Sequence, residues 1–86
     1  MGINEAALAI ETFLRTYDGG PGKPAEVQVR PSGDDVDVIK IWIDLGPAKR
    51  GVAPEAYERA CRAAIREALP ETTAFRLEVR AEADPA

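Results

Sequence analysis

The 86-residue sequence contains no histidine and only one cysteine, Cys61. Histidine is the side chain best suited to proton transfer near neutral pH and the commonest transition-metal ligand, so its absence excludes a catalytic triad. A lone cysteine cannot form an internal disulfide, and the sequence therefore gives no sign of an oxidising compartment. We expect a cytoplasmic protein with no catalytic residue, no cofactor and no bound metal.

Long apolar runs and an excess of positive charge are also missing. No run of about eighteen apolar residues occurs and no basic-then-apolar leader opens the chain, so we expect neither a membrane-spanning helix nor a secretory signal. Eleven Lys and Arg stand against fifteen Asp and Glu, which gives a net charge of −4. This balance disfavours nucleic-acid binding, because phosphate contacts need a concentrated positive field.

What remains is the composition of an ordinary globular domain. Hydrophobic residues make up 45% and charged residues 30% of the chain, far from the range in which chains stay disordered. The length leaves room for one domain, spanning residues 1–86, with residues 83–86 as a loose tail. Such a small core gives marginal stability, so covering more apolar area by association has a physical motive.

The first half of the chain predicts a helix followed by a β-hairpin. Apolar residues recur at helical spacing from Ile3 to Tyr17, Asn4 is a candidate cap, and a Gly- and Pro-rich run then ends the helix. The alternation of Glu26–Arg30 predicts a strand, and residues 31–35 have turn composition. The second extended run, 36–45, is the most apolar segment. One of its faces carries Ile39, Ile41, Ile43 and Leu45, and the other carries Val36, Val38, Lys40, Trp42 and Asp44.

The second half predicts another helix and a last strand. Pro54 suits a first helical position, and an alanine-rich stripe continues to Leu69 before Pro70 ends the helix. Thr73–Glu82 alternates as a half-buried strand. A hairpin makes the first two strands antiparallel, and a helical crossover makes the last two parallel. The predicted fold is α+β: a two-layer sandwich of order α-β-β-α-β, with a three-stranded mixed sheet and two helices on one face.

Few residues outside the sheet suggest chemistry. Cys61 lies in the alanine-rich stripe and is interpreted as a small buried residue rather than a nucleophile. Asp34, Asp35 and Asp37 crowd a turn, but their spacing does not match a calcium loop, and we interpret them as structural. Glu58 and Arg62 are expected to pair along the second helix at i,i+4 spacing, as are Glu55 and Arg59, and no function is assigned to these four residues.

The loop at 46–51 carries two cations, Lys49 and Arg50, and leads from a strand toward a helix start. That position often holds phosphate. The loop lacks the G-x-x-x-x-G-K-[ST] pattern, because Val52 follows Gly51, so we favour a flexible loop with two solvated charges over an anion site.

Trp42 is the most informative residue of the outer face. An indole on the outer face of a central strand is either core beneath a segment not yet placed or an anchor for another molecule. A third interpretation has the ring lying over Lys40 and a neighbouring arginine, exposed and without function. We favour the interface and expect a contact surface made of Val36, Val38, Lys40 and Trp42.

Four segments of the chain carry a family resemblance. They are Val27-Gln28-Val29-Arg30-Pro31-Ser32-Gly33, the strand ending at Asp44, the helix closing on Ile65-Arg66-Glu67-Ala68-Leu69-Pro70, and the final Leu77-Glu78-Val79-Arg80. Together with the α-β-β-α-β order, they resemble the cytoplasmic C-terminal domain of the cation diffusion facilitators. In that family the domain forms a dimer that regulates a membrane transporter of zinc or related divalent metals, with ligands that are often histidines together with Asp and Glu. The resemblance implies dimerisation, and a transporter or another protein as partner, but without histidine it carries over no metal ligand.

The outer face and the resemblance together predict a non-enzymatic, homodimeric regulatory or interaction module. The alternative is a small RNA-binding or ribosome-associated domain, because the same element order is similar to the KH-type fold of ribosome-binding factors. The acidic balance and the lack of a G-x-x-G turn between helices speak against it. An enzyme is the least favoured class, because only carboxylates and tyrosine are at hand for acid–base work. We therefore expect a homodimer that binds no nucleic acid and does not insert into a membrane.

Overall fold

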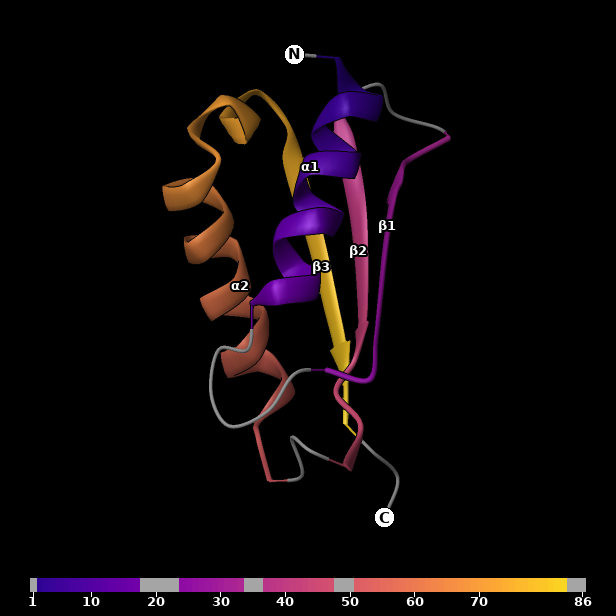
Figure 1. Ribbon diagram of the computed structural model, residues 1–86, viewed down its shortest axis with the longest axis vertical. Coiled ribbons are helices and arrows are strands. Elements are labelled where there is room, and N and C mark those ends of the chain that lie inside the picture. The colour runs from indigo at the N-terminus through magenta and orange to yellow at the C-terminus, as the bar shows by residue number, and fades with distance from the viewer. Residues whose placement is uncertain (1, 18–23, 34–36, 48–50, 84–86) are drawn as a thin grey trace.

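The computed structural model describes residues 2–17, 24–33, 37–47 and 51–83. Its elements are α1 (Ile3–Thr16), β1 (Glu26–Pro31), β2 (Val38–Asp44), α2 (Pro54–Ala68), a short 3-10 helix η2 (Pro70–Ala74) and β3 (Arg76–Glu82). The predicted α-β-β-α-β order and the α+β fold class are confirmed. Figure 1 shows α1 crossing in front of the strands, with α2 beside it.

The sheet has the strand order β1-β2-β3, so the most apolar strand is central, as predicted. β1 and β2 pair antiparallel, with Gln28 opposite Trp42 and Val29 opposite Ile41. β2 and β3 pair parallel, with Trp42 beside Arg80. The parallel pairing follows from the α2 crossover, because a connection that returns the chain to the same end of the sheet makes the next strand run in the same direction.

The core lies between the sheet and the two helices. Alternation along each strand turns every second side chain toward the helices, and the apolar stripes of α1 and α2 face the sheet in return. The buried residues of this core include Ile10 and Leu14 of α1, Ile39, Ile41 and Ile43 of β2, Tyr57, Cys61 and Ile65 of α2, and Leu77 and Val79 of β3. Because both helices pack on the same face, no described helix covers the other face of the sheet.

The start of α1 differs from the prediction. Asn4 does not cap the helix: Gly2 is the N-cap, its backbone is extended, and no side chain bonds to the helix start. The Gly2 carbonyl instead accepts the Ala6 N–H at 2.9 Å. The helix is held mainly by its buried stripe, in which Ile10 and Leu14 are almost fully covered.

The start of β3 also differs from the prediction. The sequence places the strand start at Thr73, but Pro70–Ala74 forms η2 and the strand begins at Arg76. The physical reason is a set of local hydrogen bonds that alternation cannot reveal. In η2 the Thr73 hydroxyl donates to the Pro70 carbonyl at 2.8 Å, and the Phe75 N–H donates to the Thr72 carbonyl at 3.0 Å.

Arg66 and Thr72 fix this turn against the end of α2. The Arg66 guanidinium donates to the carbonyls of Thr72 and Phe75, the latter at 2.8 Å. Thr72 is fully buried, and its hydroxyl donates to the Leu69 carbonyl at 2.7 Å. These bonds add side-chain donors to carbonyls at and beyond the end of α2, two of which also accept backbone N–H groups. They therefore set where β3 starts.

Candidate interaction surface

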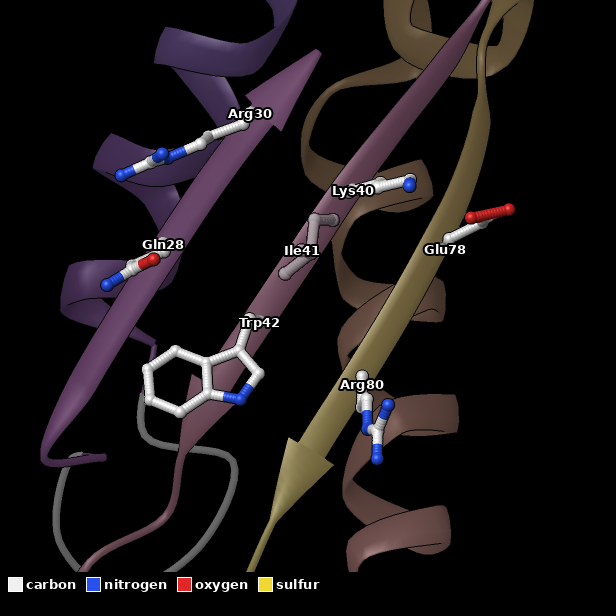
Figure 2. A pocket seen from close by; sticks show the side chains of 7 residues that line it. All are labelled: Gln28, Arg30, Lys40, Ile41, Trp42, Glu78 and Arg80. Carbon is white, nitrogen blue, oxygen red and sulfur yellow. The ribbon is translucent and has the colours of Figure 1, made fainter. Parts of the chain in front are cut away.

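The uncovered face of the sheet is called here the outer face. Side chains alternate along strands, so the residues that do not point to the helices all point to this side. They are Glu26, Gln28 and Arg30 of β1, Val38, Lys40, Trp42 and Asp44 of β2, and Arg76, Glu78, Arg80 and Glu82 of β3. Figure 2 shows the central part of this face, with the helices behind the strands.

A shallow hollow of about 210 Å³ lies over the middle of the outer face. The residues that line it are Gln28, Arg30, Lys40, Ile41, Trp42, Glu78 and Arg80. Pockets for cofactors and drug-sized molecules usually measure roughly 300–1,000 Å³. The hollow is smaller than that range, so it suits a side chain of another protein better than a whole small molecule.

Trp42 occupies the centre of the face and is half-buried. Figure 2 shows its indole leaning toward β1 below Gln28, with the ring nitrogen on the side of Arg80. Lys40 extends in the other direction, toward β3 and Glu78. The arrangement does not support the interpretation in which the ring lies beneath Lys40. Part of the indole is accessible to another molecule.

The four predicted contact residues differ in their position and exposure. Val36 lies outside the described residues. Lys40 is exposed and Trp42 half-buried, and both point to the outer face from β2. Val38 is on the same side of the strand but is only 4% exposed, so it offers a partner almost no area. The accessible surface consists instead of Lys40, Trp42 and their neighbours on β1 and β3.

The charges of the outer face balance but are not evenly spread. Its four cations are Arg30, Lys40, Arg76 and Arg80, and its four acids are Glu26, Asp44, Glu78 and Glu82. In the register of the sheet, Glu26, Asp44 and Glu82 stand in one row at the end of β2. Arg30, Lys40 and Arg76 lie toward its beginning. The face is therefore acidic at one end and mostly basic at the other.

Two ion pairs run along β3. Arg76 and Glu78 are 3.4 Å apart, and Arg80 and Glu82 are 3.7 Å apart. Their side chains are between 46% and 80% exposed. Exposed pairs contribute little to stability because water screens them. These four residues thus remain available for interactions with another molecule.

Both edges of the sheet are less suited than the outer face to receive a partner. The Ser32 N–H donates to the Val38 carbonyl, so the backbone N–H and C=O groups of the even-numbered residues of β1 point to β2. The backbone of Pro31 therefore lies on the open edge of the sheet. Proline has no N–H to offer an added strand. At the other edge, a Glu58 carboxylate oxygen accepts the Ala81 N–H at 2.8 Å. Natural sheets protect edges from strand addition in both of these ways.

Glu58 is a residue whose role the sequence does not reveal. Its i,i+4 spacing predicts a pair with Arg62, but its carboxylate instead reaches across to the backbone of β3. That prediction is wrong because the backbone N–H of an edge strand is a competing donor that is visible only in the fold. No local signal in the sequence could have indicated it, since Ala81 is 23 residues away.

Leu8 is a second feature that the predicted stripe of α1 leaves out. Its side chain is 65% exposed on α1, in the helical layer. Among the described residues it is the large hydrophobic side chain with the greatest exposure. It stands alone and lines no hollow that the structure describes, so it supplies a control for Trp42 rather than a rival surface.

The other candidates from the sequence do not form a site. Cys61 is fully buried in the core, which confirms its interpretation as a packed residue. Asp34, Asp35, Lys49 and Arg50 lie outside the described residues. Asp37 is exposed, and its carbonyl accepts the Arg76 N–H at 2.7 Å. In the part of the chain that the structure describes, no group of three His, Cys, Asp or Glu side chains is placed to hold a metal ion.

Comparisons of the chain with known protein families, with curated proteins and with solved structures find no match. A search of the described helices finds none with the length and apolar character needed to span a membrane. The function is therefore inferred from the geometry and charges of the outer face.

Proposed function

We propose that the chain is a non-enzymatic interaction module of the cytoplasm that acts as a homodimer through its outer face. The observation that carries the proposal is the position of Trp42, half-buried at the centre of a sheet face that no described element covers. Buried tryptophans at the centre of a contact dominate the energy of many interfaces. The remaining surface of this indole gains most from a partner.

The dimensions of the face indicate a weak dimer. At roughly 4.8 Å between strands and 3.3 Å per residue, the three strands present about 14 by 23 Å. The area of the face, about 320 Å², is roughly two fifths of the 800 Å² that each partner buries in an interface of standard size. Association is therefore expected to depend on concentration and to be reversible.

The charge balance of the face favours a protein partner over RNA. Four cations and four acids cancel, whereas surfaces that follow a nucleic-acid backbone are strongly positive. A balanced face with an aromatic centre and a polar rim is typical of protein–protein contacts.

The regulatory role is proposed from the family resemblance. In the cation diffusion facilitators, a domain with this element order dimerises and regulates a transporter of divalent metals. For this chain we propose regulation through dimerisation alone, without a metal ligand set of its own. The support is the α-β-β-α-β order and the hairpin that carries the resemblance.

Sedimentation velocity over a range of concentrations tests this proposal. The unmodified protein is expected to sediment as a dimer at the highest concentration, and Trp42→Lys to shift the equilibrium toward monomer by about tenfold or more. Leu8→Lys is the matched control, because it makes the same substitution at an exposed apolar residue of the other layer. A monomer at about 100 µM would overturn the proposal. A loss of dimer in Leu8→Lys alone would move the interface to α1.

A further inference from the structure

The outward charges of β3 alternate in sign along the strand. Arg76, Glu78, Arg80 and Glu82 point to the outer face in that order, two residues apart. A series that reads plus, minus, plus, minus becomes minus, plus, minus, plus when it is reversed. The strand is therefore complementary in charge to an antiparallel copy of itself. It is not complementary to a parallel copy in the same register.

Two sheets that pack face to face in aligned fashion keep their strands within about 30° of each other. A symmetric dimer of this kind has a twofold axis lying between the sheets. The axis runs either across the strands, which places each strand over its own copy in antiparallel direction, or along the strands, which places β1 over β3 of the second copy. The register of the sheet decides which charges meet in each case.

With the axis across the strands, opposite charges meet along β3. Centring the axis between the Lys40 and Trp42 positions places Arg76 opposite Glu82 of the second copy, and Glu78 opposite its Arg80. On β2 the same operation places the Lys40 position opposite the Trp42 position of the second copy. On β1, Arg30 meets Gln28. In this arrangement none of the charged side chains on the described outer face lies opposite its own sign.

With the axis along the strands, like charges meet. β2 then lies over its own copy in the same rows, so Lys40 faces Lys40 and Asp44 faces Asp44. Glu26 of β1 faces Glu82 of β3 on both sides of the contact, and these like-charge pairs outnumber the opposite-charge pair that Arg30 forms with Glu78. Like charges placed opposite each other across an interface lower the affinity strongly, and so they disfavour this orientation.

We propose that the partner of the outer face is a second copy of this chain in antiparallel orientation, with β3 over β3 and the Trp42 position opposite Lys40 of the second copy. This inference rests on the proposed homodimer and adds its orientation. The charges select the orientation, while the indole supplies most of the affinity, because rim charges affect specificity more than strength. Glu78 and Arg80 both project from β3 and line the hollow, as Figure 2 shows.

Charge reversal at Glu82 gives opposite results for the two orientations. In the antiparallel dimer, Glu82→Arg sets an arginine against Arg76 of the second copy, and self-association is expected to weaken about tenfold. In the parallel dimer the same change replaces a repulsion with Glu26 by an attraction, and association strengthens. Arg76→Glu is expected to weaken the antiparallel dimer to a similar extent. Sedimentation velocity at low salt measures each equilibrium.

Mixing the two variants tests directly whether residues 76 and 82 of the two copies lie opposite each other. A heterodimer of Glu82→Arg and Arg76→Glu restores an opposite-charge pair at both ends, so the mixture is expected to associate about as strongly as the unmodified protein and to weaken with added salt. Misfolded variants would not recover on mixing, which keeps the test independent of stability. A dimer that Glu82→Arg tightens or leaves unchanged would overturn the antiparallel orientation and leave the proposed function intact. A monomeric unmodified protein would overturn both.

Discussion

Buried polar groups that are satisfied by a single partner are the most sensitive residues of this fold. Thr72 is the fully buried polar residue of the described core, and its hydroxyl donates to the Leu69 carbonyl at 2.7 Å. Thr72→Val keeps the shape of the side chain and removes the hydroxyl donor, while the Leu69 carbonyl keeps its bond from the Thr72 N–H at 3.0 Å. We expect a loss of about 1–2 kcal/mol in the free energy of unfolding, measured by urea denaturation.

Thr73 provides the matched control within the same turn. Its hydroxyl makes the equivalent bond to the Pro70 carbonyl at 2.8 Å, but on the exposed side. Water can replace that bond, so Thr73→Val is expected to cost less than about 0.5 kcal/mol. Equal costs at the two positions would show that burial does not set the value of the Thr72 bond.

For single residues, the sequence predicts which apolar side chains are buried, but it does not predict the hydrogen-bond partners of polar side chains. The spacing of Ile10 and Leu14 in α1 and of Cys61 and Ile65 in α2 was sufficient to place them in the core. The cap at Gly2 and the contact of Glu58 with the β3 backbone were not predictable. Polar side chains choose among several donors and acceptors, and that choice depends on the tertiary fold.

Among the elements, the bend after β2 depends on one glycine. Gly46 has a φ of +68°, and a Cβ built on it would lie 2.6 Å from the Ala25 Cβ. Gly46→Ala therefore meets both a strained backbone and a collision next to the start of β1. We expect a loss of about 2 kcal/mol or more, observed as a lower midpoint of thermal unfolding.

Gly33 is the control for this prediction. A Cβ at Gly33 meets nothing within 4 Å, and its φ is not in the positive range. Gly33→Ala is expected to change stability by less than about 0.5 kcal/mol. If Gly46→Ala were equally mild, the bend would have another conformation available to it, and the close approach to β1 would not limit the fold.

The boundaries of the elements show where sequence patterns stop being informative. Pro54 at the first turn of α2 was predictable, because its missing N–H costs nothing at that position. The 3-10 turn Pro70–Ala74 was not, because Thr73 and Phe75 fit the alternation of a strand equally well. Hydrogen bonds from Arg66 to this turn decide between the two conformations, and they form only once α2 is in place.

For the whole molecule, connection rules limit the topology to a few arrangements, and the apolar composition of the second strand favours its central position. A short hairpin and a helical crossover allow few arrangements of three strands, and the observed order β1-β2-β3 is one of them. The location of Trp42 on the outer face followed from alternation along β2. The rows of charge across the sheet did not, because they depend on the register between strands.

Trp42 can report directly on whether the outer face is a contact between two copies of the chain. It is the single tryptophan of the chain, so its fluorescence comes from one known position. Emission spectra and acrylamide quenching are to be recorded along a dilution series that spans the dimer–monomer equilibrium, with sedimentation as the independent measure of association.

In the dimer the indole is shielded from water, so dilution is expected to move its emission to longer wavelength and to increase quenching, in step with dissociation. If tryptophan emission and quenching stay constant while the dimer dissociates, the outer face is not the dimer contact, because Trp42 is then equally accessible in dimer and monomer.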